Sequence, residues 1–352
     1  MRVPFLKPSK YKVSRLVDHR RLNPGFLPGL QIVCDIDKTY LETEFESVSR
    51  IIGIAFQAAE DKITVKGATD VLDLARWSQT QDYPAPKGLH FVSSSPPQLR
   101  GVLDEKFVLD GLDWDSDTFK NQAYNIRKRR VDLLRNHVAY KSLAITQVLL
   151  EGEGPFVFIG DNAESDAWIY LGIAFLCQGK LTPQGFRQYL EIAGVEGEFY
   201  EFTSEQLEKL RATKIAAILI RNAPGYHFVG FEPLTKGVQL FDNFFEAAVV
   251  MIHLGVIAPS DLRWLVRRFV NQHGLSIEDI DKALGGLKAK SSPDREPVLA
   301  SIDGYLGETR GEPKGDKFEI AELNIGEISE STILSHAQKW ADLIAQAKQS
   351  HV

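Results

Sequence analysis

The chain has 352 residues, of which 44% are hydrophobic and 25% charged, a composition typical of globular proteins with a sizeable core. Its formal net charge of −6 argues against non-specific nucleic-acid binding by the protein as a whole, so no nucleic-acid partner is expected. Two cysteines cannot form a disulfide framework, which favours a reducing compartment. The longest apolar stretch, 247–258, is too short to span a bilayer.

The N-terminal segment 1–24 is basic, with seven lysine and arginine residues against a single aspartate. It lacks the continuous apolar region of a signal peptide. Two interpretations remain open: a solvated arm, or a strip that meets anionic membrane surfaces. We therefore expect a cytoplasmic protein, with peripheral membrane contact through this arm as the alternative.

From residue 25 to 229, short apolar runs alternate with amphipathic stretches of helical length. The runs predict strands at 30–37, 88–95, 116–122, 155–161 and 214–221. The stretches between them predict helices at 46–61, 67–79, 96–110, 140–152 and 204–212. Strands that lack polar alternation and alternate with helices indicate a parallel sheet covered on both faces. The crossover rules then give a doubly wound α/β domain, a three-layer sandwich.

The sequence pattern changes in the C-terminal region, residues 230–352, where mainly helices are predicted. Helices are predicted at 237–257, 259–273, 276–287 and 331–349. Segment 288–317 is rich in Pro, Gly, Ser and charge, which is typical of a linker or long loop. The apolar stripe at 240–257 is expected to be core or a partner interface. This helical extension is the part of the chain expected to bind a protein partner or to self-associate.

Polar side chains follow three of the predicted strands, at the ends where ligands bind in open parallel sheets. A lysine also stands at the start of the helix that precedes the last of these strands. The candidate site residues are therefore Asp35, Asp37, Ser93, Lys141, Asp161 and Asp166. The first two aspartates are separated by one residue and repel each other unless a cation or a shared proton intervenes. Mg²⁺ suits a site with several carboxylates and a substrate phosphate.

This set of groups fits phosphoryl transfer from a monoester. One carboxylate can act as the nucleophile and form an aspartyl-phosphate, while the second protonates the leaving oxygen and later activates water. A serine hydroxyl and a lysine ammonium can hold the phosphoryl oxygens, where negative charge lies in the transition state.

The motifs DIDKTY, FVSSSP, the isolated Lys141 and FIGDNAESD resemble, in order and spacing, the four motifs of the haloacid dehalogenase (HAD) superfamily. More narrowly, SSSPPQL, GDNAESDAWIY and IAAILIRNA resemble the catalytic domain of the fungal actin-patch phosphatidate phosphatase family and its bacterial relatives, over roughly residues 25–225. The resemblance implies a Rossmann-like, HAD-type fold.

The same resemblance implies a role for each site residue. Asp35 would be the nucleophile and Asp37 the general acid and base. Ser93 would bind phosphate and Lys141 would stabilise charge. Magnesium would be held by Asp35, Asp161 and the Asp37 carbonyl, with Asp166 supporting the metal.

The chain departs from the narrower family at Lys38, Ser94 and Pro97, where an acidic residue, an asparagine and an aromatic are usual. No catalytic role is lost, so the departures bear on substrate identity. We expect a Mg²⁺-dependent phosphomonoester hydrolase acting on a phosphorylated substrate, with phosphatidate-like lipid as the leading candidate. The alternatives are a soluble phosphoester, a phosphorylated macromolecule, or a catalytically silent interaction protein that uses the helical tail.

The segments between the motifs are short, so no large cap domain is expected and the site is predicted to be open. A small lid from 171–200 is the alternative. The basic run at 127–130 falls between the second and third motifs and reads either as a solvated helix face or as a rim that attracts anionic groups.

Overall fold

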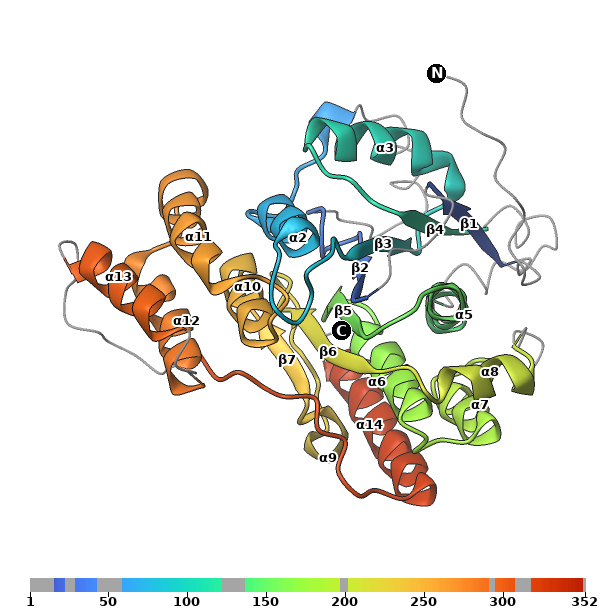
Figure 1. Cartoon of the computed structure of the whole chain (residues 1–352). Coiled ribbons are helices and arrows are strands. Elements are labelled where there is room, and N and C mark those ends of the chain that lie inside the picture. The colour runs from blue at the N-terminus through green and yellow to red at the C-terminus, as the bar shows by residue number, and fades with distance from the viewer. Residues whose placement is uncertain are drawn as a thin grey trace.

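The computed structural model describes residues 16–22, 29–42, 59–121, 137–196, 202–290, 295–307 and 318–350. It contains a seven-stranded sheet with the order β1-β4-β3-β2-β5-β6-β7, flanked by helices (Figure 1). The strands are β1 (Val17–Arg21), β2 (Gln31–Asp35), β3 (Gly88–Ser93), β4 (Ser116–Lys120), β5 (Phe156–Asp161), β6 (Ile215–Arg221) and β7 (Val238–Phe241). The five predicted strands are all present.

Strands β2 to β7 are parallel, and only β1, at one edge, runs antiparallel to its neighbour β4. Side chains of β2 alternate between the faces: Ile32 and Cys34 join one hydrophobic cluster and Val33 joins the other. Both faces of the sheet are thus covered, which confirms the predicted doubly wound α/β sandwich. No large cap domain is present among the described residues.

One hydrophobic cluster receives side chains from six helices: α2 (Ala68–Trp77), α3 (Arg100–Leu109), α10 (Phe244–His253), α11 (Leu262–Arg268), α12 (Ile277–Ala289) and α13 (Glu296–Gly307). The other receives them from α5 (His137–Glu151), α6 (Asp166–Cys177), α7 (Pro183–Ile192), α8 (Ser204–Leu210), α9 (Glu232–Thr235) and α14 (Glu330–Ser350). The two clusters form the outer layers of the sandwich against the central sheet.

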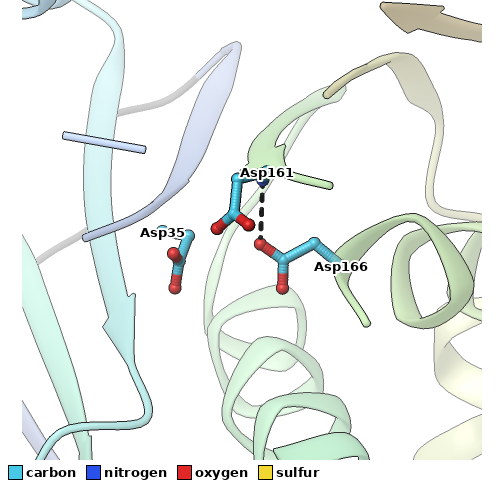
Figure 2. Close-up of side chains that lie close together, drawn as sticks. All are labelled: Asp35, Asp161 and Asp166. Atoms are coloured by element: carbon cyan, nitrogen blue, oxygen red, sulfur yellow. Dashed lines mark hydrogen bonds between the residues drawn. The ribbon is translucent and has the colours of Figure 1, made fainter. Parts of the chain in front are cut away.

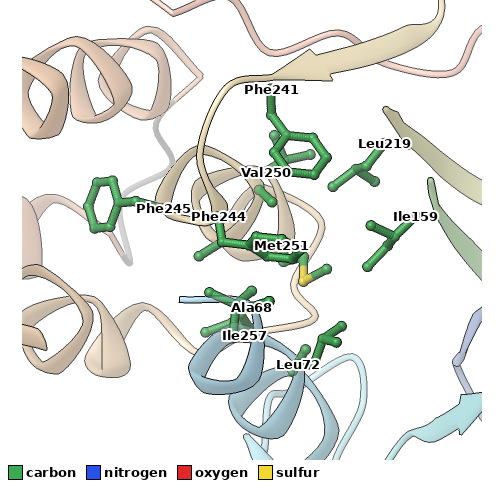
Figure 3. Close-up of a cluster of buried hydrophobic side chains, with 14 of the residues drawn as sticks. Ala68, Leu72, Ile159, Leu219, Phe241, Phe244, Phe245, Val250, Met251 and Ile257 are labelled. Atoms are coloured by element: carbon green, nitrogen blue, oxygen red, sulfur yellow. The ribbon is translucent and has the colours of Figure 1, made fainter. Parts of the chain in front are cut away.

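The C-terminal region is built onto the core. Strand β7 pairs with β6 beyond residue 230, and α10 packs its apolar side chains against α2 and the sheet (Figure 3). In that cluster Phe244 and Met251 lie among Ala68, Ile159 and Leu219, all fully buried. The apolar stripe at 240–257 was expected to be core or a partner interface, and the structure supports core.

Two local predictions in this region are wrong. Residues 237–257 do not form one helix, because Val238–Phe241 is a strand and α10 begins only after Asn243, whose side chain accepts a hydrogen bond from Glu246 N. Helix α13 occupies part of the segment predicted as a loop. Its buried Leu299, Ile302 and Leu306 recur at helical spacing and supply the packing that composition did not reveal.

Helix α14 packs against α6 through an aromatic contact. Trp340 lies 4.8 Å from Trp168 of α6, between ring centroids, and donates a hydrogen bond of 2.6 Å from Nε1 to the Val229 carbonyl. Tyr189 of α7 stacks on the same Trp168. The described residues of 171–200 therefore pack in the core, mostly as α6 and α7, and do not form a lid.

Three predictions fall on residues outside the described ranges: most of the helix at 46–61, the basic run at 127–130 and most of the basic arm. Among the described helices, none has both the length and the apolar character that a bilayer crossing requires.

His90 of β3 gives the fold a dependence on pH. It is buried between Ser116 Oγ, 2.8 Å from Nδ1, and Gln31 Oε1, 2.9 Å from Nε2, and burial lowers its pKa to about 3. The unfolded chain binds a proton near the ordinary pKa of about 6.5, so stability is complete above that pH and falls as the pH drops below it.

We expect the free energy of unfolding to fall by up to about 1.4 kcal/mol per pH unit between about pH 6.5 and pH 5 through this residue. Urea denaturation of wild type and His90→Gln over that range measures the effect, since the variant lacks the titrating ring. Equal pH slopes for the two proteins would contradict the assignment.

Candidate active site

Three carboxylates from separate elements meet at the carboxyl edge of the sheet. Asp35 ends β2, Asp161 ends the adjacent strand β5, and Asp166 begins α6. One oxygen of each lies within 4.8 Å of the others, and all three residues are buried (Figure 2). The Asp161 backbone N–H donates to Asp166 Oδ2 at 3.2 Å, which fixes the loop between the two residues.

The electrostatics of this acidic cluster favour a cation. Burial raises the pKa of Asp35 well above its ordinary value, and repulsion from Asp166 adds to the effect although Lys141 opposes it. Burial and the neighbouring carboxylates also raise the pKa of Asp161 to about 8. A hard divalent cation prefers such oxygen ligands and would remove this cost. The donor set therefore fits a divalent metal ion.

Lys141, on α5, connects the carboxylates. Its Nζ lies 2.8 Å from Asp35 Oδ1, 2.6 Å from Asp166 Oδ1 and 2.9 Å from Glu164 Oε2. Burial alone would lower the pKa of Lys141, but the surrounding carboxylates outweigh it and raise that pKa, so the ammonium stays charged. Sequence reasoning placed Lys141 at this edge, and the structure brings it to the acidic cluster.

Glu164 is a site residue that sequence reasoning missed. Burial would raise its pKa, but the charges of Lys141 and His137 dominate and lower it to about 2. The residue lies between the two aspartates of the GDNAESD motif, and its position in that loop is the signal that could have singled it out. It adds a permanent negative charge beside Lys141.

The Asp37 carboxylate is not one of these three clustered groups, and it contacts the serines after β3. Its Oδ2 accepts hydrogen bonds from Ser93 Oγ at 2.9 Å and Ser95 Oγ at 3.1 Å. The Ser95 backbone N–H donates to Ser93 Oγ at 3.0 Å, which fixes that hydroxyl. Burial raises the pKa of Asp37, as is needed for a carboxyl group that delivers a proton. The structure thus places Ser93 beside Asp37.

The turn after β2 holds Asp35 and Asp37 in place. Backbone N–H groups of Tyr40 and Leu41 donate to the Ile36 carbonyl at 3.0 and 2.9 Å. Thr39 Oγ1 lies 3.4 Å from one oxygen of Asp35 and 3.4 Å from one of Asp161, so it bridges the first and last motifs. The acidic groups are therefore preorganised by the surrounding hydrogen bonds.

Comparison with known proteins finds a family for this part of the chain. Residues 30–181 match the model described as "Phosphatidate phosphatase APP1, catalytic domain". An uncharacterized protein of Schizosaccharomyces pombe (strain 972 / ATCC 24843) is 26% identical over 147 residues, which cover 42% of this chain and 23% of that protein. This chain therefore matches less than a quarter of that curated relative. No solved structure matches the chain. Residues 30–181 are thus a match to the catalytic domain of the actin-patch phosphatidate phosphatase family, the family that the sequence motifs resemble.

Proposed function

We propose that the protein is a Mg²⁺-dependent phosphomonoester hydrolase of the HAD type, with Asp35 as nucleophile. The observation that carries the proposal is the meeting of Asp35, Asp161 and Asp166 around one point, with Lys141 in contact with two of them. Asp35, Asp161 and Asp166 are the residues that would hold the metal ion. When bound, the ion would offset the negative charge of the carboxylates and of the substrate phosphate.

In the first step a carboxylate oxygen of Asp35 bonds to phosphorus, and the bond from phosphorus to the leaving oxygen breaks. Asp37 donates its proton to that oxygen, so an alcohol leaves and an aspartyl-phosphate remains. Asp37 is then a carboxylate. It takes a proton from water as the water oxygen bonds to phosphorus and the bond from phosphorus to the Asp35 oxygen breaks, which releases inorganic phosphate and restores both aspartates.

Two further side chains stabilise these steps. The Lys141 ammonium can bind a phosphoryl oxygen as charge builds up there, and the Ser93 hydroxyl, oriented by Ser95 N–H, can bind another. All of these groups are present together, which favours an enzyme over the catalytically silent interaction protein.

The proposal predicts that a divalent ion both activates and stabilises the protein. Chelation should reduce phosphate release from phenyl phosphate to background, and Mg²⁺ should restore it. Because the ion binds the folded acidic cluster, Mg²⁺ at about 100 times its dissociation constant should add about 2.7 kcal/mol to the free energy of unfolding. Turnover that survives chelation, with no change in stability, would rule out the metal.

For the substrate, we propose a phosphatidate-like lipid, supported by the name of the matching family model. The alternative is a soluble phosphoester or a phosphorylated macromolecule. Phosphate release from phosphatidate vesicles, compared with release from a panel of soluble phosphoesters, separates the two. Activity confined to the soluble panel would remove the lipid substrate and leave the chemistry in place.

A further inference from the structure

Arg221 is a buried cation at the end of β6 that the proposed mechanism does not use. It is 6% exposed, and its register partner in the neighbouring strand β5 is Asp161. Among the described residues its guanidinium forms one hydrogen bond, from Nη1 to the Lys38 carbonyl at 2.6 Å, and no ion pair, while its Nε has no partner. Burying a guanidinium for a single bond to a neutral group is costly, so packing alone does not account for this side chain.

The backbone and the side chain of Arg221 contact two loops of the site. Its carbonyl accepts a hydrogen bond at 3.0 Å from the backbone N–H of Asn162, the residue directly after Asp161. Its guanidinium donates to the carbonyl of Lys38, the residue directly after Asp37. Arg221 therefore connects the loop that carries Asp161 with the turn that carries Asp37.

Lys38 has a backbone conformation that requires support from its surroundings. Its φ is 59°, which lies in the left-handed region and is unfavourable for a residue with a β-carbon. The hydrogen bond from Arg221 holds the Lys38 carbonyl and with it this conformation. Asp37 precedes Lys38 and Thr39 follows it. Because Thr39 Oγ1 lies 3.4 Å from one oxygen of Asp35, a different backbone angle at Lys38 would move Asp37 relative to Asp35.

We propose that Arg221 is a positioning residue that holds Lys38 in the left-handed conformation. The turn then presents Asp35 and Asp37 in the arrangement that the proposed reaction needs, so this inference rests on the proposed function. Alignment matters because a displacement of about 1 Å between reacting groups can cost about 100-fold in rate. The competing explanation is charge balance, in which the guanidinium only offsets the negative charge of Asp161, its register partner.

Glycine and alanine at position 38 separate the two explanations. Both Lys38→Gly and Lys38→Ala remove the ammonium, but only glycine adopts the left-handed conformation without a steric cost. If Arg221 acts through backbone conformation, Lys38→Gly should compensate for the loss of the guanidinium, whereas Lys38→Ala should not. If Arg221 acts through its charge, both substitutions should worsen the loss equally, since each removes a second positive charge.

The test measures phosphate release from phenyl phosphate at saturating Mg²⁺. We expect Arg221→Met to lower kcat by about 10–100-fold, the usual effect of removing a group that supports a metal site, and to change KM by less than about threefold. In the Arg221→Met background, Lys38→Gly should be about tenfold faster than Lys38→Ala, whereas with Arg221 present the two should differ by less than about threefold. Arg211→Met, at an exposed arginine, is the matched control and should keep the kcat of wild type.

Hydrogen exchange of the metal-free proteins reports on the same turn without any need for activity. Two backbone amides of the turn donate to the Ile36 carbonyl, so a peptide that covers residues 36–41 should exchange faster in Arg221→Met than in wild type. In that background its exchange should be slower with Lys38→Gly than with Lys38→Ala. If Arg221→Met does not fold, Arg221→Lys takes its place. Lysine keeps the charge but is shorter and lacks the planar guanidinium, so charge balance predicts the kcat of wild type and positioning predicts a loss that Lys38→Gly reduces.

Equal turnover of the glycine and alanine variants in the Arg221→Met background would overturn the positioning role and leave charge balance. An Arg221→Met protein with the kcat of wild type would overturn it as well, although the proposed function would stand. If wild type itself releases no phosphate, the proposed function fails, and the exchange of the 36–41 peptide then decides the inference. Exchange that is unchanged by Arg221→Met would overturn the hold of Arg221 on Lys38, and faster exchange that Lys38→Gly reverses would support it.

Discussion

Asp35→Asn is expected to reduce phosphate release from phenyl phosphate by about 10⁴-fold or more, because loss of an enzyme nucleophile typically costs that much or more. The amide nitrogen and oxygen occupy the same space as the carboxylate but cannot form the covalent bond to phosphorus. Single-turnover assays at saturating Mg²⁺ measure the loss directly. A variant within about tenfold of wild type would remove Asp35 from the nucleophile position.

Measuring the stability of Asp35→Asn is the control for this experiment. Burial and repulsion from Asp166 raise the pKa of Asp35, so its carboxylate destabilises the fold above that pKa. Without metal, Asp35→Asn should therefore be at least as stable as wild type to urea, and the loss of turnover then reports chemistry. A large loss of stability would show that Asp35 holds the fold together and would leave its catalytic role to another test.

The sequence predicts the central strands well because of how they are buried. β2, β3, β5 and β6 are covered on both faces and appear as continuous apolar runs between helices. The two edge strands, β1 and β7, do not appear as separate apolar runs. β1 has the polar sequence VDHRR, whose charged side chains form ion pairs with α3, β4 and α5, such as Arg20 with Asp117. β7 is four residues long and merges into the apolar pattern of α10.

The same contrast holds at the site. Asp35, Asp161 and Lys141 could be located from sequence because each stands at or near a strand end, or at a helix start, whose place in a parallel sheet is known. Glu164 could not, because a charged residue in a loop is usually solvated. Its place at the site depends on a contact distant in sequence, the ion pair with Lys141.

The motifs indicate the reaction more clearly than they indicate the substrate. The motif residues define how a phosphate group is transferred, and these are the groups that the sequence reveals. This is why the chemistry can be proposed more narrowly than the substrate.

Lys141→Met is expected to lower the free energy of unfolding by about 3–5 kcal/mol in the presence of a chelator, the usual cost of removing one partner of a buried ion pair. Lys141 is 1% exposed and its ammonium contacts Asp35, Glu164 and Asp166. Methionine keeps most of the side-chain length but leaves these buried carboxylates without their cation. Urea denaturation near neutral pH measures the loss, and Lys214→Met, at an exposed lysine, should change stability by less than about 0.5 kcal/mol.

A second substitution separates charge from packing. Asp166→Asn removes one of the carboxylates that Lys141 neutralises, so it should restore part of the stability that Lys141→Met loses and should change the stability of wild type by less. The coupling between the two substitutions should be about 1–3 kcal/mol, as for residues in one network. Mg²⁺ should likewise recover more stability in Lys141→Met than in wild type, since the ion then supplies the missing positive charge. Additive effects of the two substitutions, with no extra stabilisation by Mg²⁺, would mean that Lys141 acts by filling space and that the acidic cluster is held by its hydrogen bonds.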